Sequence, residues 1–208
     1  MNKHLIALGD SLSVGIGDEP GPDGAPLGWI RRLLDFPGPD RQTDLLLNLG
    51  VVNARTPQVR FGQLPTALRH TARCAALITG MNDALTKFAP QHYERDYAAV
   101  VAGLAEHFPL VLTATLPDIS AQVAPDPGTA ARIRTHILTA NDIIRKASAR
   151  HDTVCFDAWA ATAMAPDVWS PDGLHPNARG YAGIATAYRD LIGIRVGSSF
   201  RTWLEKSP

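Results

Sequence analysis

Short apolar runs alternate with longer stretches of helical spacing along the chain, and this alternation constrains the fold more than any other feature. The runs occupy residues 5–8, 45–47, 75–78, 110–112 and 154–156. Each run is continuously apolar, which is typical of strands covered on both faces in a parallel sheet. Strands and helices alternating in this way predict an α/β protein, a three-layer α/β/α sandwich with a central five-stranded parallel sheet.

Three amphipathic helices are expected between or after these runs. Their apolar residues recur every three to four positions, so that each set forms one face of a helix. The sets are Tyr93, Tyr97, Val100 and Leu104; Ile133, Ile137, Ala140 and Ile144; and Tyr181, Ile184 or Ala185, Tyr188 and Leu191–Ile192. Segments 17–28 and 116–128 contain prolines or glycines at high density, which predicts two long loops.

Length and charge describe an ordinary globular chain. Its 208 residues are expected to form one domain at 1–196, followed by a C-terminal tail at 197–208. Twenty basic and twenty acidic residues cancel, so no overall field favours nucleic acid. The densest basic pair, Arg31–Arg32, is expected on a solvated helix face.

Simple sequence features also bear on the membrane insertion, cellular location and cysteine state of the protein. No apolar stretch approaches the ~20 residues that span a bilayer, so membrane insertion is not expected. The first residues run directly into an apolar strand, which favours a cytoplasmic location. Cys74 and Cys155 are expected to be buried, reduced thiols. Monomer and homodimer both remain open.

Polar segments follow three of the predicted strands. Gly9-Asp10-Ser11 follows the first, Asn48 the second, and Gly80-Met81-Asn82-Asp83 the third. In parallel α/β sheets, ligands bind beyond the carboxyl ends of the strands. These segments are therefore predicted to share one edge of the sheet.

Ser11, Asp172 and His175 are the side-chain types that nucleophilic acyl transfer requires: a hydroxyl, a base, and a carboxylate that orients the base. A carboxylate three residues before a histidine can bind Nδ1 and leave Nε2 facing the hydroxyl. Alternatively, Ser11 is an ordinary turn or N-cap serine. None of the seven histidines forms an HxxxH or HExxH pair, so no metal site is expected.

Together, these segments resemble the four sequence blocks of the SGNH (GDSL-type) hydrolases, in the family's order and over nearly the whole chain. The quoted motifs are Gly9-Asp10-Ser11-Leu12-Ser13, the segment from Asn48 to Thr56, Gly80-Met81-Asn82-Asp83 and Asp172-Gly173-Leu174-His175. The resemblance implies a flavodoxin-like fold and a serine esterase that needs no cofactor and acts on a small-molecule ester. It implies Ser11 as the nucleophile, His175 as the general base and then acid, and Asp172 as its partner.

The resemblance also implies an oxyanion hole, and here the chain departs from the family. The implied donors are the Ser11 N–H, a glycine N–H five residues after Asn48, and the Asn82 side-chain amide. This chain has Asn53 at the glycine position. Because asparagine tolerates left-handed backbone geometry, Asn53 is expected still to present its N–H.

The substrate is less constrained than the chemistry. A short chain without a large lid domain favours short acyl, acetyl-type esters. A lysophospholipase or thioesterase acting on longer acyl groups, or a non-catalytic member that binds an acyl group or sugar, remains an alternative. Trp29 and Trp169 are expected either to line an acyl pocket or to pack in the core, and Asp83 to cap the helix that follows it.

Overall fold

The computed structural model describes residues 3–34, 46–162, 166–199 and 202–203, and its centre is one parallel sheet. The strand order is β2-β1-β3-β4-β5, and every pairing is parallel. The strands are β1 (Lys3–Gly9), β2 (Leu46–Asn48), β3 (Ala72–Ile78), β4 (Leu110–Ala114) and β5 (Val154–Phe156). The predicted fold class is confirmed; residue 45 of the second predicted run lies outside the described residues.

Helices of very different length connect the strands. The long ones are α7 (Pro90–His107), α9 (Pro127–Arg150) and α11 (Ala178–Val196), which confirm the three predicted amphipathic helices and extend each of them. The shorter ones are α1 (Ser11–Val14), α2 (Gly28–Leu33), α4 (Thr56–Gln58), η2 (Val59–Gln63), α5 (Leu64–Ala67), α6 (Met81–Ala84), α8 (Ser120–Val123), α10 (Ala158–Thr162) and η3 (Pro166–Val168).

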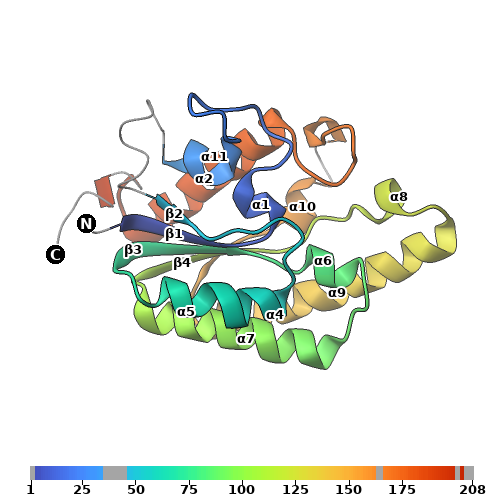
Figure 1. Ribbon diagram of the computed structural model, residues 1–208, viewed down its shortest axis with the longest axis horizontal. Helices are drawn as coiled ribbons and strands as arrows, with labels where there is room; N and C mark the ends of the chain where they lie inside the picture. The colour runs from blue at the N-terminus through green and yellow to red at the C-terminus, as the bar shows by residue number, and fades with distance from the viewer. Residues whose placement is uncertain (1–2, 35–45, 163–165, 200–201, 204–208) are drawn as a thin grey trace.

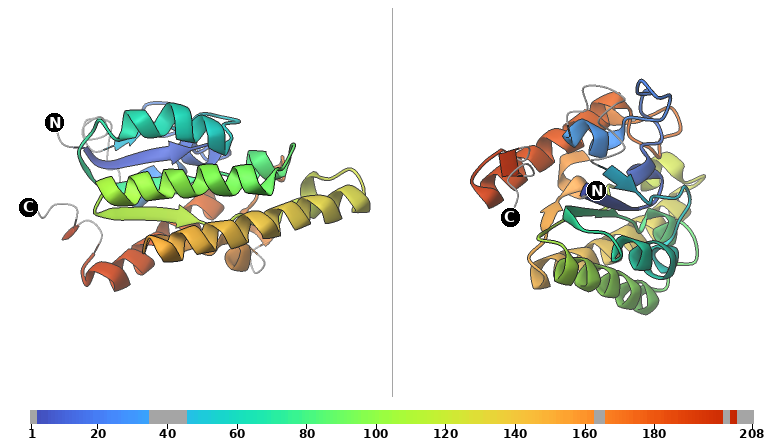
Figure 2. Two further views of the ribbon diagram at one scale, coloured as in Figure 1. Left: turned by 90° about the horizontal axis from the view of Figure 1, so that it is seen from below. Right: turned by 60° about the vertical axis from the view of Figure 1, so that its left-hand side comes forward.

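The sheet has an apolar layer on each face. Leu5 and Ala7 of β1 pack in the layer beneath α2 and α11, whereas Ile6 and Leu8 pack in the layer that α5, α7 and α9 cover. Figure 1 shows α1, α2 and α11 above the sheet, and Figure 2 shows α5, α7 and α9 side by side on the opposite face. Because both faces are covered, the strands contain continuous apolar runs rather than alternating apolar and polar residues.

The connections that leave the neighbouring strands β1 and β3 diverge to opposite faces of the sheet. The chain leaves β1 toward α1 and α2 on one face, and leaves β3 toward α6 and α7 on the other (Figure 1). Such a divergence opens a crevice at the carboxyl ends of the two strands, where α/β proteins bind ligands. Ser11 follows β1 and Asn82 follows β3, so both lie at this crevice.

The predicted loop at 116–128 is partly wrong. It contains α8, and its last residues already belong to α9. Pro127 is the first residue of α9, a position where proline is tolerated because its missing N–H would have no partner there. Asp126 caps this helix by accepting a hydrogen bond from the Thr129 N–H. Of the prolines that indicated a loop, Pro127 therefore marks a helix start.

The glycine- and proline-rich loop after α1 is held by the two arginines expected on a solvated face. Arg31 is buried and pairs with Asp23 at 2.8 Å, and Arg32 pairs with Asp18 at 2.8 Å. That expectation is therefore wrong, because the loop folds back over α2 and brings its carboxylates to both guanidinium groups.

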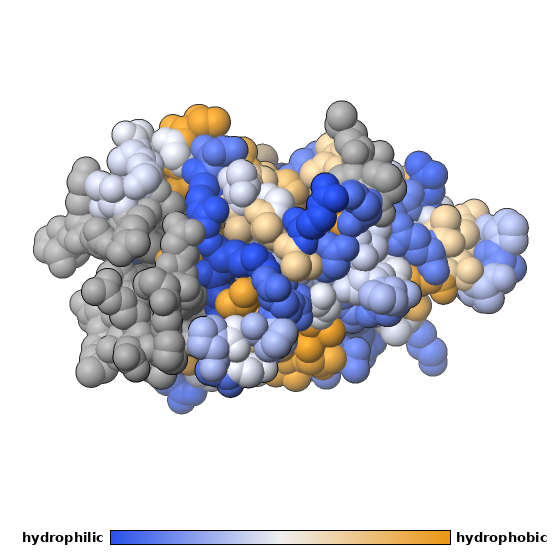
Figure 3. Space-filling model, turned by 90° about the horizontal axis from the view of Figure 1, so that it is seen from above, coloured by the Kyte–Doolittle hydropathy of each residue, from blue (hydrophilic) through white to orange (hydrophobic). Residues whose placement is uncertain are grey.

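Other expectations are met in part. Cys74 and Cys155 are both free, but only Cys74 is buried. Within the described ranges, no helix is long and apolar enough to cross a membrane. On the face viewed in Figure 3, apolar side chains lie in separate small patches. In the tail, Trp203 packs against the apolar layer of α2 and α11, and the domain boundary at 196 stays a prediction.

Candidate active site

Ser11 lies at the first turn after β1, where the backbone geometry is tightly set. Gly9 has a φ of 134°, and a Cβ there would lie 2.0 Å from the Ile78 carbonyl oxygen of β3, so no other residue fits. Asp10 then caps α1 by accepting a hydrogen bond from the Leu12 N–H at 3.0 Å. Ser11 is consequently the first residue of a short helix, with its hydroxyl beyond the strand end.

The structure brings the three predicted acyl-transfer side chains within hydrogen-bonding distance of one another, in the order Ser11, His175 and Asp172. His175 Nε2 lies 2.9 Å from Ser11 Oγ, although the two residues are 164 positions apart. His175 Nδ1 lies 2.7 Å from Asp172 Oδ2. This order of hydroxyl, imidazole and carboxylate is the one that activates a serine.

The carboxylate of Asp172 is fixed by its other oxygen. Oδ1 accepts hydrogen bonds from the N–H groups of Leu174 and His175 at 2.9 and 3.0 Å. Partial burial pushes the pKa of Asp172 upward, but the hydrogen bonds from the His175 ring and the two N–H groups outweigh it and hold the pKa below its ordinary value. Asp172 is therefore ionised at neutral pH.

Asn177 shapes the loop that carries Asp172 and His175, a role that the sequence argument missed. Its Nδ2 donates to the carbonyl oxygen of Trp169 at 3.0 Å, and its Oδ1 caps α11 through the Arg179 N–H at 2.9 Å. The Ser170 N–H donates to the His175 carbonyl oxygen at 2.8 Å and closes the loop. A polar residue just before a helical repeat is an N-cap signal, so this role was recognisable.

Two long-range hydrogen bonds tie this loop and helix α11 to the segment after Ser11. The Tyr181 hydroxyl donates to the Ile16 carbonyl oxygen at 2.7 Å, and Ser170 Oγ donates to the Gly17 carbonyl oxygen at 3.3 Å. Tyr181 is fully buried, so its bond is shielded from competing water. These contacts hold the segment after Ser11 against the loop that carries His175 and against α11, and so fix the Ser11–His175 pair.

Asn53 and Asn82, the other predicted site residues, lie on adjoining segments. Asn53 has a φ of 65°, the left-handed conformation that the sequence argument anticipated. Asn82 Nδ2 donates to the carbonyl oxygen of Ala54, the residue after Asn53, at 3.0 Å. One amide proton of Asn82 thus joins the two segments, and the side-chain amide has no second acceptor among the described residues.

The expectation that Asp83 caps the helix after it is wrong. Asp83 lies inside α6, and its Oδ2 accepts hydrogen bonds from both the N–H and the Oγ1 of Thr56 at 3.0 Å. It therefore binds the N-terminus of α4, a helix that precedes it in the chain. This contact is a second link between the segments that carry Asn53 and Asn82.

Gln63 holds the backbone just before Ser11, and nothing in the sequence pointed to it. Its Oε1 accepts from the Gly9 N–H at 2.7 Å, and its Nε2 donates to the Gly9 carbonyl oxygen at 2.9 Å. Gln63 is buried and ends the π-helical turn η2, a conformation that is frequent at functional sites. Because 54 positions separate the two residues, no local pattern reveals this pairing.

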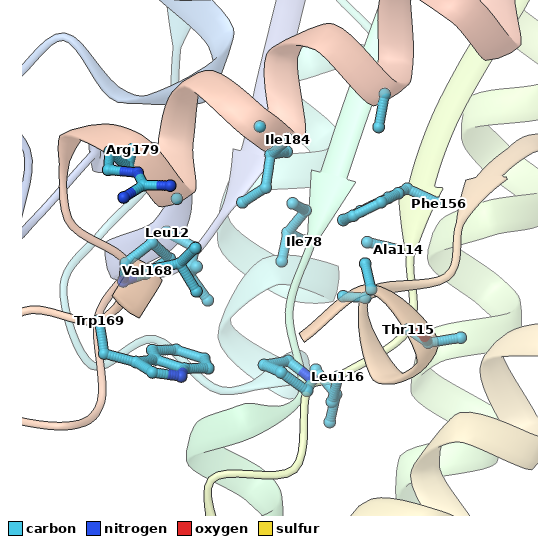
Figure 4. Close-up of a pocket in the computed structure, with 17 residues that line it drawn as sticks. Leu12, Ile78, Ala114, Thr115, Leu116, Phe156, Val168, Trp169, Arg179 and Ile184 are labelled. Carbon is cyan, nitrogen blue, oxygen red and sulfur yellow. The ribbon is translucent and has the colours of Figure 1, made fainter. Parts of the chain in front are cut away.

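The two tryptophans differ in their surroundings. Trp29 is fully buried and stacks on Tyr188 with ring centroids 4.7 Å apart, so it belongs to the core. Trp169 instead lines an apolar cavity beside α11 (Figure 4).

Among the described residues, no group of three or more histidine, cysteine, aspartate or glutamate side chains could hold a metal ion.

Asp10 is a buried carboxyl group beside Ser11. Burial raises its pKa to about 7; the Leu12 N–H opposes this shift and the nearby Asp83 adds to it. An unfolded chain releases this proton near pH ~3.9. The folded protein therefore binds more protons between these values, and the stabilisation from protonated Asp10 is complete below the lower value and lost as the pH rises to the upper one.

We expect Asp10→Asn to stabilise the protein at about pH 8 relative to wild type, by up to about 4 kcal/mol, and much less at about pH 4. Asparagine stays neutral and can still cap α1. Urea unfolding of both proteins at the two pH values measures the difference. The control Asp126→Asn should act oppositely, because hydrogen bonds from Thr129 lower the pKa of Asp126. An Asp10→Asn effect that is equal at both pH values would contradict this assignment.

Comparison with known proteins shows the family of the chain. The sequence matches the GDSL-like lipase/acylhydrolase family over residues 7–182. The chain belongs to this family. This GDSL-like acylhydrolase is therefore a carboxylic ester hydrolase, and the resemblance inferred from its motifs is confirmed. A search of curated proteins found no match.

Solved structures similar to this GDSL-like acylhydrolase share its fold along nearly the whole chain. An α/β-hydrolase enzyme from the metagenome of Lake Arreo, Spain, is 21% identical, with a TM-score of 0.70 over 92% of this chain and 95% of that one. A putative GDSL-like lipase from Parabacteroides merdae is 18% identical, with a TM-score of 0.72 over 93% and 98%. An acetylxylan esterase from Geobacillus stearothermophilus is 14% identical, with a TM-score of 0.66 over 92% and 94%.

Proposed function

We propose that the protein hydrolyses carboxylic esters through Ser11, His175 and Asp172, by way of an acyl-enzyme on Ser11. The observation that carries this proposal is the unbroken chain of contacts from Ser11 Oγ to His175 Nε2 at 2.9 Å and from His175 Nδ1 to Asp172 Oδ2 at 2.7 Å. Such a chain gives a weakly acidic hydroxyl a base that is oriented to take its proton.

The reaction then has two matching halves. In the first, His175 takes the Ser11 proton while Oγ bonds to the acyl carbon, and the imidazolium formed is stabilised by Asp172. His175 returns the proton to the departing alcohol as the carbon–oxygen bond breaks. In the second half, His175 takes a proton from water as the water oxygen bonds to the acyl carbon. His175 then returns that proton to Ser11 Oγ as the bond between Oγ and the acyl carbon breaks, which releases the carboxylic acid and free Ser11.

The oxyanion of each intermediate requires donors on the side away from His175. We assign this role to the Ser11 N–H, the Asn53 N–H and the Asn82 side-chain amide. The left-handed backbone of Asn53 and the hydrogen bond between Asn82 and Ala54 support this assignment, because they fix both groups before substrate binds. Removing one such donor typically costs about 2.7–4 kcal/mol of transition-state stabilisation.

Small esters are the proposed substrate class. The sequence favours acetyl-type esters, and one similar structure is named as an acetylxylan esterase. The preferred acyl length stays a prediction, and the apolar cavity lined by Leu12 and Trp169 bears on it. Cytoplasmic location also stays a prediction, as does the choice between monomer and homodimer.

A fluorophosphonate reagent tests the proposal and separates it from a non-catalytic binding function. We expect one adduct per chain, located on the peptide that contains Ser11, because only an activated serine hydroxyl attacks phosphorus rapidly. Mass spectrometry of the intact protein and of its peptides measures the adduct. A heat-denatured sample, in which the Ser11–His175 contact is lost, should not react. An unmodified native protein, or an adduct on a different serine, would rule out this assignment.

A further inference from the structure

An apolar cavity of about 250 Å³ lies beside α11, at the carboxyl ends of β3, β4 and β5 (Figure 4). Its lining is almost entirely apolar and includes Ile78, Phe156 and Ile184. Of the described lining residues only Arg179 carries a charge, and its guanidinium is exposed and paired with Asp167. A site of this kind favours an apolar group, because a buried polar group without a partner costs free energy.

The cavity exists because α11 presents small residues on the side that faces it. Gly180, Gly183 and Ala187 all line the cavity and are spaced as one face of a helix. Gly180 is packed tightly, since a Cβ there would lie 2.5 Å from the Val168 carbonyl oxygen. A Cβ at Gly183 would meet nothing within 4 Å. The helix therefore lies close to the loop before it and leaves open space one turn later.

The cavity reaches the two segments that carry the reacting side chains, although neither Ser11 nor His175 lines it. Leu12, which directly follows Ser11, lines it, and so does Pro176, which directly follows His175. Trp169 extends the same wall along the loop that carries His175, and Figure 4 shows Trp169 and Leu12 toward the same side of the cavity. The lining thus includes the immediate chain neighbour of each reacting residue, which places the cavity at the same end of the sheet as Ser11 and His175.

We propose that this cavity binds the acyl chain of the ester, and that the preferred acyl group is a medium-length saturated chain rather than acetyl. This proposal rests on the function proposed above for Ser11. A cavity of ~150 Å³ holds benzene, so by proportion this one has room for about ten carbon atoms, enough for an octanoyl chain. The acyl group is the part of the substrate that stays on Ser11 while the alcohol leaves, which suits a recess walled by α11 and the strand ends.

The test is a series of p-nitrophenyl esters from acetate to laurate, which share one alcohol. We expect kcat/KM to rise toward octanoate by at most about fourfold per methylene, to at least about tenfold over acetate, and then to fall. A parallel series of alkyl acetates, which varies only the alcohol, should show no such rise. A rise confined to the alkyl acetates would assign the cavity to the alcohol and overturn the proposal.

Two variants in α11 should move the optimum in opposite directions. Gly183→Leu introduces a side chain where Cβ has free space, and should lower the octanoate-to-acetate ratio of kcat/KM at least about tenfold. Ile184→Ala widens the cavity and should shift the optimum to a longer chain. Gly193→Leu makes the same change in the same helix away from the cavity and should leave the ratio unchanged.

A binding measurement tests the cavity without turnover. Octanoate should bind the Ser11→Ala protein more tightly than acetate does, by calorimetry, and Gly183→Leu should remove the difference. Equal binding of the two acids, or a ratio unmoved by both α11 variants, would overturn the acyl proposal. If p-nitrophenyl acetate is hydrolysed in a Ser11-dependent way while the chain-length profile is flat, the proposed function stands and only the cavity assignment fails.

Discussion

Replacing Ser11 with alanine is expected to lower kcat for p-nitrophenyl acetate by about 10⁴- to 10⁶-fold. Ser11 Oγ is the atom that bonds to the acyl carbon, and it is the group within 2.9 Å of His175 Nε2. Without it the imidazole has no hydroxyl to activate, and the acyl-enzyme cannot form. Initial rates measured against a buffer blank give the loss.

Ser13→Ala is the matched control for this change. Ser13 lies in the same short helix, but its hydroxyl donates to the Leu8 carbonyl oxygen at 2.8 Å and faces the protein interior. We expect this variant to lose some stability in urea unfolding and to keep kcat within about tenfold of wild type. If Ser11→Ala retains more than about one per cent of wild-type kcat, the nucleophile is a different group.

Asp172→Asn is expected to lower kcat by about 10⁴-fold without unfolding the protein. Oδ1 of Asp172 accepts from two backbone N–H groups, so the amide oxygen of asparagine should take that position. Its NH₂ group then faces His175 Nδ1 and can only donate to it. The ring is held with its proton on Nε2, where it cannot accept the proton of Ser11.

Asp152→Asn controls for the loss of a carboxylate. Asp152 is exposed and paired with Arg195, and its φ of 53° is one that asparagine tolerates. Its activity should match wild type. Circular dichroism and urea unfolding should show both variants folded. An Asp172→Asn protein that is folded and within about tenfold of wild-type kcat would remove Asp172 from the mechanism.

Local sequence patterns were sufficient to predict the strands and the three long helices. Continuous apolar runs gave the five strands because a strand buried on both faces must be apolar throughout. Periodicity gave α7, α9 and α11 because one face of each packs against the sheet or its neighbours. The errors arose where one residue type serves two purposes. Pro127 begins a helix rather than extending a loop, and Arg31 pairs with the carboxylate of Asp23 in the preceding loop rather than with water.

The sequence by itself determined which side chains can carry out acyl transfer and the order in which strands present them. Asp172 and His175 are three residues apart, so their pairing depends on local geometry that short motifs encode. Only the tertiary structure decided that this pair meets Ser11, because the hydrogen bond from Tyr181 to Ile16 joins segments 165 positions apart. The tertiary structure also decided the hydrogen bonds between Gln63 and Gly9 and the cavity beside Gly183. Each depends on how whole elements pack, and no repeat or spacing along the chain records that.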